Sequence, residues 1–336
     1  MNGVLFINGQ REEIAKIFCG MALEGFQVSW VPYSLSEDEK AKLIRDVEVV
    51  VLHPAAISEE LLKEAKSLHL IQLLAAGYDE INLELTSELG IPVATNGGAN
   101  ALSVAEHCVA MLLALYQRLP QCDQSVRQGT WRKPVSGFNT YEVSGKTVGI
   151  IGAGNIGCKV AQRFKAFEAQ ILYCDERPAP EMENELGARK VQLDELLCES
   201  DIITVHVPLL RDTRALIGER ALSLMKPNAV LINASRGPII DEKALIKALT
   251  QHQIAGACLD VFEKEPIAND NPLLQLENVL LTPHTAGHSY EGWFRRSRFA
   301  WENIERVASG QQPLSLATEE DWNQEKPELE IAMVEH

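Results

Sequence analysis

The fold of this chain is decided by Lys146-Thr147-Val148-Gly149-Ile150-Ile151-Gly152-Ala153-Gly154-Asn155-Ile156-Gly157, in which a glycine-rich turn follows directly on an apolar run. The apolar run predicts a buried strand, and the turn has the spacing G-x-G-x-x-G. In that motif the first glycine permits a tight turn, the second lets the backbone approach a pyrophosphate, and the third lets helix and strand pack closely. A helix beginning at the turn offers free N–H groups and a partial positive charge to the phosphates. The stretch therefore predicts a dinucleotide-binding unit.

The residues beyond the turn fit the same interpretation. One helical stripe of apolar side chains follows it, formed by Ile156, Val160, Phe164 and Phe167. The run Ile171-Leu172-Tyr173-Cys174 then predicts a second strand. Eighteen residues beyond Gly157 comes Asp175, whose carboxylate would accept hydrogen bonds from ribose hydroxyls. Because a carboxylate there repels a 2′-phosphate, NAD is favoured over NADP, and Arg177 is interpreted as a solvated loop residue instead of a phosphate ligand.

The bulk composition is that of an ordinary globular protein. A chain of 336 residues with 46% hydrophobic and 23% charged residues has room for two domains, each with its own core. The net charge of −16 argues against a nucleic-acid surface but not against a small anionic substrate, which needs only a local cationic site. The chain begins with a strand-like run and contains no segment apolar enough to span a bilayer, so we expect a soluble cytoplasmic protein.

The cysteines are odd in number, scattered and never paired as C-x-x-C. They are Cys19, Cys108, Cys122, Cys158, Cys174, Cys198 and Cys258. This distribution predicts reduced core thiols and neither disulfides nor a metal site.

Strand and helix patterns alternate along the whole chain, which predicts an α/β fold with two doubly wound parallel sheets. The expected strands before residue 100 are Val4–Ile7, Gln27–Val31, Val47–Leu52, Leu70–Leu74 and Pro92–Thr95. Those after residue 146 are 147–151, 170–174, 202–207, 229–233, 256–260 and 279–282. Because the glycine turn lies in the second series, we expect a Rossmann nucleotide-binding domain there and a flavodoxin-like substrate domain in the first.

Two longer helical patterns connect these units, one from about Asn100 to Gln128 with a break near Pro120, the other from about Ser289 to Ser309. The substrate domain is then discontinuous, made of residues 1–99 and 288–336, and residues 100–287 form the NAD-binding domain. We expect the ligands to bind in a cleft between them. From Thr318 onwards the chain is acidic, which indicates either a solvated end or an arm that docks onto a neighbouring subunit.

Polar residues follow three of the apolar runs of the second series. These are Arg236, Glu265 and His284, all expected at the carboxyl edge of the sheet that faces the dinucleotide. In a hydride-transfer site the arginine would bind and polarise an anionic keto acid, the histidine would exchange the proton, and the glutamate would orient the histidine. Each residue alone is more simply a surface or loop residue. Their joint presence after a dinucleotide motif favours catalysis.

With these motifs the chain resembles the D-isomer-specific 2-hydroxyacid dehydrogenase family. Beyond Gly152–Gly157, the resemblance rests on Asn100–His107, His206–Leu209, Asn233–Gly237, Asp260–Pro266 and Thr282–Gly287, and it covers roughly residues 45 to 312. It implies that Arg236 binds the substrate carboxylate and carbonyl, that His284 is the proton donor and acceptor, and that Glu265 is its partner. It also implies that Asp260 holds the nicotinamide carboxamide.

The resemblance implies further ligands for substrate and cofactor. The loop Ala75-Ala76-Gly77 would cradle the substrate carboxylate with its backbone N–H groups. The cofactor would contact Val104, His206, Val207, Pro208, Thr213, Ala234, Ser235, Arg236, His284 and Gly287 in addition to the glycine turn and the two aspartates. Phosphite is an unfavoured substrate because the loop has alanines where phosphite-oxidising members have lysine. Formate is unfavoured because Glu265 stands where formate-oxidising members have glutamine.

The resemblance implies reversible, NAD-dependent hydride transfer between a small 2-keto acid and a D-2-hydroxy acid. Phosphoglycerate is an alternative substrate, and an NAD(H)-sensing corepressor on the same scaffold is an alternative function. The resemblance also implies a homodimer, and the apolar run 110–115 would suit either its interface or a core. After His284, the cluster His288, Trp293, Arg295, Arg296 and Arg298 indicates either a packed basic helix or a pocket for a bulky or doubly anionic substrate.

Overall fold

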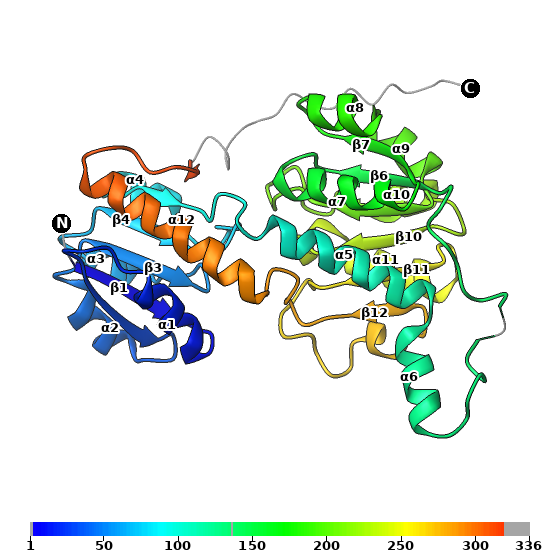
Figure 1. The fold of residues 1–336 in the computed structure, drawn as a ribbon, viewed down its shortest axis with the longest axis horizontal. Coiled ribbons are helices and arrows are strands. Elements are labelled where there is room, and N and C mark those ends of the chain that lie inside the picture. The colour runs from blue at the N-terminus through cyan, green and yellow to red at the C-terminus, as the bar shows by residue number, and fades with distance from the viewer. Residues whose placement is uncertain (1–2, 136, 319–336) are drawn as a thin grey trace. The chain divides into compact units, whose positions relative to one another are not determined.

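The computed structural model describes residues 3–135 and 137–318 and divides into two compact units (Figure 1). Unit 1 comprises the described residues within Met1–Gly97, Leu210–Asp212 and Ser297–His336, and unit 2 comprises Gly98–Leu209 and Thr213–Arg296. The second boundary falls later than the one at residue 288 in the sequence analysis, because the helix that begins at Tyr290 is shared by both units. The predicted acidic tail lies mostly outside the described residues.

Unit 1 is built on one sheet with helices on its faces. Its strands are β1 (Gly3–Asn8), β2 (Gln27–Pro32), β3 (Val49–His53), β4 (Leu70–Leu73), β5 (Val93–Ala94) and β13 (Leu316–Ala317). Its helices are α1 (Glu12–Gly20), α2 (Glu37–Ile44), α3 (Glu59–Glu64), α4 (Leu83–Glu88) and the carboxyl-terminal half of α12 (Tyr290–Ala308). The parallel strands have the order β2-β1-β3-β4-β5, which is that of flavodoxin-like sheets. The sequence analysis missed β13, a two-residue strand that pairs antiparallel with β5.

The last part of α12 completes the core of unit 1. Trp301 stacks on Phe18 with ring centroids 5.0 Å apart and donates its indole N–H to the Phe18 carbonyl oxygen at 2.9 Å. Asn303 is fully buried, but its side-chain amide donates to the Gln72 side chain at 2.8 Å and accepts from the Leu314 N–H at 2.7 Å. Residues that are distant in the sequence therefore share one core.

Unit 2 contains a wholly parallel sheet of the dinucleotide-binding type. Its strands, in spatial order, are β12 (Val279–Leu281), β11 (Gly256–Leu259), β10 (Val230–Asn233), β9 (Ile202–Val205), β6 (Thr147–Ile151), β7 (Gln170–Cys174) and β8 (Arg189–Lys190). Starting from β8, the first six strands from that end follow the order 3-2-1-4-5-6. The prediction of two parallel-sheet α/β units is thus confirmed, although the sequence analysis missed β8.

Helices cover both faces of the second sheet. They are α5 (Ala101–Tyr116), α6 (Leu119–Arg127), α7 (Asn155–Ala166), α8 (Pro180–Leu186), α9 (Leu193–Glu199), α10 (Glu219–Leu224) and α11 (Glu242–Thr250), with short 3₁₀ turns at Gly237–Ile239 and Pro272–Gln275. The predicted break of the first long helix falls two residues before Pro120, at Arg118, whose φ of 52° is left-handed. Pro120 itself lies in the first turn of α6, where its missing N–H costs no hydrogen bond.

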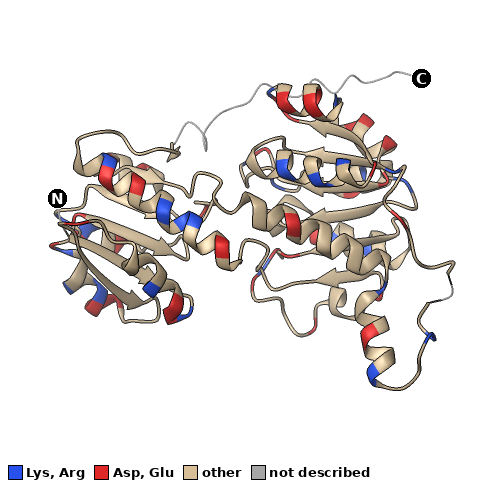
Figure 2. Ribbon diagram, in the orientation of Figure 1, with Lys and Arg blue, Asp and Glu red and all other residues tan. Residues whose placement is uncertain are grey.

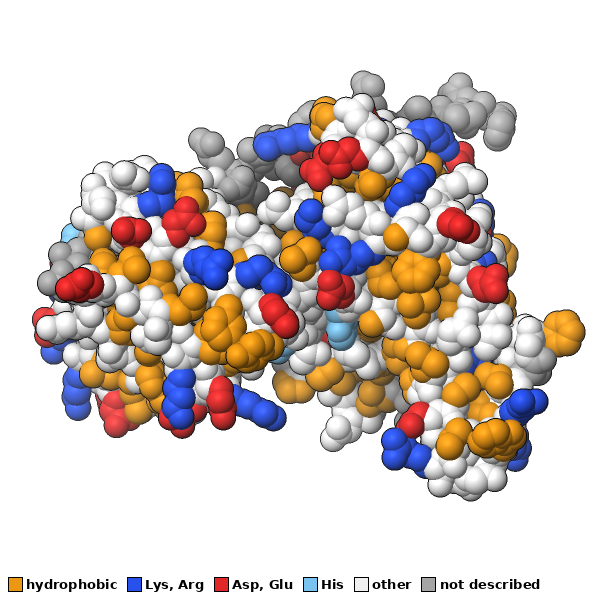
Figure 3. Space-filling view, viewed as in Figure 1, with side chains coloured by type: hydrophobic (Ala, Val, Ile, Leu, Met, Phe, Trp, Pro, Cys, Tyr) orange, Lys and Arg blue, Asp and Glu red, His pale blue; other side chains and the backbone are white. Residues whose placement is uncertain are grey.

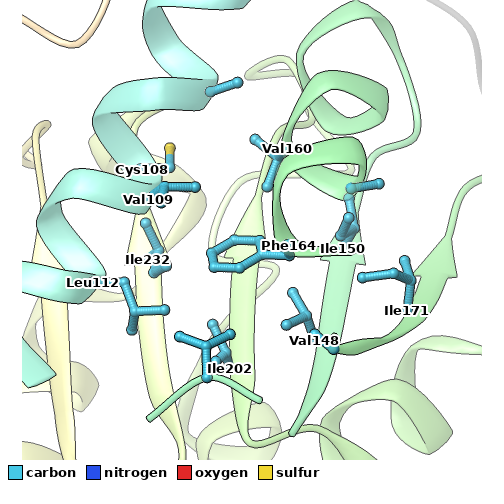
Figure 4. Close-up of a cluster of buried hydrophobic side chains, with 14 of the residues drawn as sticks. Cys108, Val109, Leu112, Val148, Ile150, Val160, Phe164, Ile171, Ile202 and Ile232 are labelled. Carbon is cyan, nitrogen blue, oxygen red and sulfur yellow. The ribbon is translucent and has the colours of Figure 1, made fainter. Parts of the chain in front are cut away.

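The core between α5, α7 and the sheet is apolar. Phe164 lies at its centre, surrounded by side chains from α5 and from the neighbouring strands (Figure 4). Val160 and Phe164 are fully buried, as the predicted stripe on this helix requires. Phe167 is 39% exposed, because α7 ends at Ala166 and the chain turns away from the stripe. The core fixes α7, and with it the turn at the amino-terminal end of that helix.

Charged side chains of both signs are spread over the surface. In unit 2, Lys and Arg colour parts of α7 and Asp and Glu parts of α8 (Figure 2). On the face seen in Figure 3, cationic side chains alternate with anionic ones. Hydrophobic side chains gather over α6 in the same view, and Trp131 and Phe138 after that helix are 67% and 93% exposed. The homodimer that the resemblance implies stays a prediction.

The structure also bears on the expectations for the cysteines, for membrane-spanning segments and for metal sites. All seven cysteines are free thiols, but only Cys108 and Cys258 are buried in the core, and Cys198 is exposed. Among the helices of the described residues, none is both long and apolar enough to cross a membrane. The described residues also contain no cluster of three or more His, Cys, Asp or Glu side chains suited to a metal ion.

Candidate active site

The glycine turn between β6 and α7 has two positions at which packing excludes any side chain. Gly152 has a φ of +96°, and a Cβ there would lie 2.8 Å from the carbonyl carbon of His206. A Cβ on Gly157 would lie 2.0 Å from the Gly152 oxygen. The first and third glycines of the motif are therefore required by the fold itself, as the motif predicts.

Gly154, the second glycine of the motif, is different. A Cβ there would meet no described protein atom within 4 Å, and its φ of −77° is one that any residue adopts. Packing therefore gives no reason for glycine at this position. The open space lies at the amino-terminal end of α7, where helix N–H groups are available to an anion. This open position is what the second glycine of the motif predicts, since a pyrophosphate there would approach the backbone closely.

Two polar side chains flank the turn at the ends of neighbouring strands. Asp175 follows β7 and accepts hydrogen bonds from the Ala153 N–H at 2.8 Å and the Arg177 N–H at 2.9 Å. His206 follows β9, and its Nε2 lies 2.8 Å from the Thr204 hydroxyl. Burial lowers the pKa of His206 to about 3, so its imidazole is neutral. Among the described residues, its buried Nδ1 has no hydrogen-bond partner, as expected for a group that a bound molecule would satisfy. These residues fit a dinucleotide.

The candidate catalytic residues come from three adjacent strands. Because β10, β11 and β12 are parallel neighbours, their carboxyl ends lie at one edge of the sheet. Arg236 follows β10, Asp260 follows β11 and His284 follows β12. The His284 N–H donates to the Asp260 carbonyl oxygen at 2.7 Å, and the Asp260 N–H donates to the Asn233 carbonyl oxygen at 2.9 Å. The structure thus joins the three segments that the sequence analysis singled out.

His284 and Glu265 form a direct pair. The imidazole Nδ1 lies 2.6 Å from Glu265 Oε2, and the Phe262 N–H donates to the other carboxylate oxygen at 3.0 Å. The His284 side chain is 48% exposed, so the pair is accessible. Its backbone is left-handed, with a φ of 53°, which costs a non-glycine residue free energy and is typical of functional sites.

The charge state of Glu265 decides which imidazole nitrogen is available. Burial by itself raises the pKa of Glu265, but the hydrogen bond and charge of His284, the Phe262 N–H and the charge of Arg236 together lower that pKa below its ordinary value. An ionised carboxylate only accepts hydrogen bonds, so Nδ1 of His284 carries the shared proton. His284 Nε2 is then the imidazole nitrogen that the Glu265 carboxylate does not engage.

Asp260 is fully buried, and its carboxylate organises the segment that carries His284. Oδ1 accepts from the Thr282 hydroxyl at 2.6 Å and the Thr285 N–H at 2.9 Å, and Oδ2 accepts from the Ala286 N–H at 2.8 Å. The sequence analysis missed His107, whose Nε2 lies 3.0 Å from the Thr282 hydroxyl and 3.6 Å from Asp260. The sequence analysis quoted His107 only as the last residue of the Asn100–His107 stretch and assigned it no role.

Arg236 is held by its own strand end. Its Nη1 donates to the Ser235 carbonyl oxygen at 2.8 Å, and its carbonyl oxygen accepts from Asn233 Nδ2 at 2.9 Å. The next residue, Gly237, could carry no side chain, because a Cβ there would lie 1.8 Å from the Phe262 oxygen. This close approach of two backbones fixes the loop of Arg236 against the loop that leads to Glu265. The sequence analysis quoted Gly237 only as the end of a motif.

The other predicted ligands occupy varied positions. Val104 is buried on α5, and Val207 and Ala234 are half-buried at strand ends of unit 2. Thr213 donates its hydroxyl to the Pro208 carbonyl oxygen at 2.6 Å. Ala75, Ala76 and Gly77 form a partly exposed loop after β4 in unit 1. The contacts of these residues with substrate or cofactor stay predictions.

A family model described as "D-isomer specific 2-hydroxyacid dehydrogenase, NAD binding domain" matches residues 109–286. This range is more than half of the chain and includes the glycine turn, Arg236, Glu265 and His284. The chain belongs to the D-isomer specific 2-hydroxyacid dehydrogenase family. A nicotinamide dinucleotide is the cofactor of that domain, as its description states.

Two relatives show how much of the chain is similar to proteins of the 2-hydroxyacid dehydrogenase family. A glyoxylate reductase of Thermococcus litoralis is 41% identical over 283 residues, which are 82% of this chain and 85% of that protein. A D-3-phosphoglycerate dehydrogenase of Archaeoglobus fulgidus is 38% identical over 294 residues, which are 86% of this chain. The matched part is only 55% of that longer protein.

A solved structure of similar fold is an acyclic imino acid reductase in complex with NADPH and D-Arg. It is 29% identical, has a TM-score of 0.79, and the match covers 94% of this chain and 99% of that chain. The family identification in the sequence analysis is confirmed, since both the domain model and these members agree with it. The choice between NAD and NADP is not decided by these likenesses.

Proposed function

We propose that this chain reduces a small 2-keto acid to a D-2-hydroxy acid with NADH, and that the reaction is reversible. The pair of His284 and Glu265, with Nδ1 and Oε2 2.6 Å apart beside Arg236 at the strand ends of an NAD-binding sheet, is the observation that carries the proposal. Such a pair supplies a positioned acid and base, and a nearby guanidinium supplies the cation that a keto acid needs.

The proposed mechanism assigns one task to each side chain. When bound, the cofactor supplies the hydride that adds to the keto carbon. Arg236 binds the substrate carboxylate and polarises the carbonyl group, because its charge stabilises the negative oxygen that develops. His284 donates the proton at Nε2 to that oxygen, and the ionised Glu265 stabilises the protonated imidazole beforehand. In the reverse direction His284 accepts the proton from the hydroxyl group.

The same proposal assigns NAD as the cofactor in preference to NADP. Asp175 stands at the end of β7 with its carboxylate directed to the glycine turn, since it accepts from the Ala153 N–H at 2.8 Å. The Asp175 carboxylate would repel the 2′-phosphate that NADP carries on its ribose. Arg177 is exposed after this carboxylate and only its backbone N–H contacts it. Comparing kcat/KM for NADH and NADPH at fixed substrate measures this preference.

Replacing Gly154 with alanine is expected to weaken NADH binding by about tenfold or more, which is at least about 1.4 kcal/mol, without affecting the fold. The Cβ would occupy space that is open in the protein but needed by the pyrophosphate. Fluorescence titration with NADH and thermal unfolding measure the two effects. Gly157→Ala is the comparison, because its Cβ would lie 2.0 Å from the Gly152 oxygen and should lower the melting temperature. Unchanged NADH affinity of Gly154→Ala would contradict the assigned role.

NADH oxidation by the purified protein tests the proposed function. The substrates are glyoxylate, pyruvate, hydroxypyruvate, phenylpyruvate, 2-ketoisocaproate, oxaloacetate and 3-phosphohydroxypyruvate, with NADPH run in parallel. Turnover of any of them, with the D configuration of the product established, supports the proposal. Tight NADH binding without turnover of any keto acid would contradict it and would favour the NAD(H)-sensing alternative.

A further inference from the structure

The start of α12 and the segment before it contain a cationic group that the proposed mechanism does not use. Arg296 is 3% exposed and forms no ion pair with any carboxylate among the described residues. Its Nε is buried and has no hydrogen-bond partner in that part of the chain. A buried arginine normally has a carboxylate or a full set of acceptors, because an unpaired buried charge is costly.

The contacts that Arg296 does make direct it to the catalytic segment. Its Nη2 donates to the Gly287 carbonyl oxygen at 2.5 Å, and its guanidinium lies 4.6 Å from the ring centroid of Trp293. Side chains on a helix lean towards its amino-terminal end, so Arg296 reaches back along α12 to the residues just after His284. Burial, and then the charge of Arg295, lower the pKa of Arg296 to about 10, which leaves it cationic at neutral pH.

Gly287 lets the buried guanidinium approach the catalytic segment closely. A Cβ at this position would lie 2.5 Å from Arg296 Nη2, so any side chain would stand against the guanidinium. The φ of Gly287 is not left-handed, and its backbone therefore does not demand glycine. The missing side chain therefore lets Nη2 lie against the backbone three residues beyond His284.

His288 lies beside Trp293, the residue whose ring faces the Arg296 guanidinium. Its side chain is exposed, and its ring centroid lies 5.3 Å from that of Trp293. Burial, and then the charges of Arg296 and His284, lower the pKa of His288, while Asp260 acts in the opposite direction. Arg296 and His284 are thus both within electrostatic range of His288.

We propose that Arg296 and His288 form a subsite for a second anionic group on the substrate, a carboxylate or a phosphate at the end distant from the keto acid. The inference rests on the proposed function, since it places the keto-acid end of the substrate at Arg236 and His284. The second anion supplies the buried guanidinium with the partner that the described residues lack. Trp293 holds the guanidinium in place through its ring face.

The test compares keto acids that match in length and differ in the terminal group. The pairs are oxaloacetate with 2-oxobutyrate, 2-oxoglutarate with 2-oxopentanoate, and 3-phosphohydroxypyruvate with hydroxypyruvate. For at least one pair we expect the wild-type protein to have a kcat/KM at least about tenfold higher for the dianion, as a charge-assisted hydrogen bond would give. The carboxylate and phosphate pairs show which group the subsite takes.

In Arg296→Met this ratio is expected to fall by about 10- to 100-fold, mainly through KM of the dianion. Gly287→Ala keeps the charge but places a Cβ against it, and should lower the ratio even if Arg296→Met folds poorly. Arg298→Met is the control, because Arg298 is an exposed cation on the same helix and its loss should leave the ratio unchanged.

A ratio near one in the wild-type protein, or a ratio that neither Arg296→Met nor Gly287→Ala lowers, would overturn the subsite while the proposed function stands. An equal fall for both members of each pair would show a purely structural role of Arg296 and would overturn it too. Absence of turnover for every member of every pair would overturn the proposed function itself, and the subsite with it.

Discussion

Replacing His284 with glutamine is expected to lower kcat for keto-acid reduction by about 10²- to 10⁴-fold, the usual contribution of a positioned general acid. The amide cannot exchange a proton near neutral pH, although it can still hydrogen-bond to Glu265. NADH affinity should persist, because the glycine turn and Asp175 are untouched. Steady-state assays measure kcat, and fluorescence titration measures the binding of NADH.

His252→Gln is the matched control for this variant. His252 is an exposed histidine of unit 2, and its φ of 52° reproduces the left-handed backbone of His284. Any strain that glutamine introduces in such a conformation is then present in both proteins. If His284→Gln keeps a turnover close to that of His252→Gln, His284 is not the proton donor.

Glu265→Gln separates the charge of the pair from its geometry. The pKa of Glu265 is lowered from its ordinary value of 4.5, so the charge interaction exists at neutral pH and is lost only as pH falls through the lowered pKa. With glutamine the protonated imidazole loses its counter-charge, and the pH profile of reduction should move towards acid. An unmoved profile would remove Glu265 from the mechanism.

Replacing Asp260 with asparagine is expected to destabilise the protein by about 2–4 kcal/mol, and so to lower the melting temperature by roughly 5–15 °C. The carboxylate accepts from two backbone N–H groups and the Thr282 hydroxyl, and an amide NH₂ can accept from none of them. The segment that carries His284 would also lose its position, so kcat should fall at least about tenfold. Thermal unfolding and steady-state assays measure the two effects.

Asp194→Asn shows what the same substitution costs on the surface. The Asp194 side chain is 48% exposed and pairs with Arg220, and such a pair contributes well under about 1 kcal/mol. If Asp260→Asn is no more damaging than this control, Asp260 does not organise the catalytic segment. Its sequence-based role towards the nicotinamide would then be the better explanation of the residue.

The fold could be predicted from the sequence because its strands are short apolar runs with clear ends. The run Ile171-Leu172-Tyr173-Cys174 became part of β7, and β6 has the predicted bounds, Thr147–Ile151. The two strands that were missed, Arg189–Lys190 and Leu316–Ala317, are two residues long. A two-residue strand has no periodicity, and only its tertiary pairing defines it.

The residues of the candidate site also fall into those that the sequence predicted and those that it did not. Arg236, Glu265 and His284 follow apolar strands, so their position at one edge of a sheet follows from parallel topology. His107 and Gly237 act through contacts with Thr282 and the Phe262 backbone, which are distant in the sequence. The left-handed backbone of His284 could not be predicted from the sequence either, because histidine does not require that conformation. Pairwise geometry of this kind is set by packing and leaves no local pattern.

The division of unit 1 between the two ends of the chain has a consequence for biosynthesis. Its core needs Trp301 against Phe18 and Asn303 against Gln72, and these partners leave the ribosome about 230 to 280 residues apart. Unit 2, which is nearly continuous in sequence, can fold first while the amino-terminal segment waits with its apolar strands uncovered. A nascent chain that ends before α12 therefore lacks the part of the unit 1 core that Trp301 and Asn303 supply, although both residues of the candidate catalytic pair have already been synthesised.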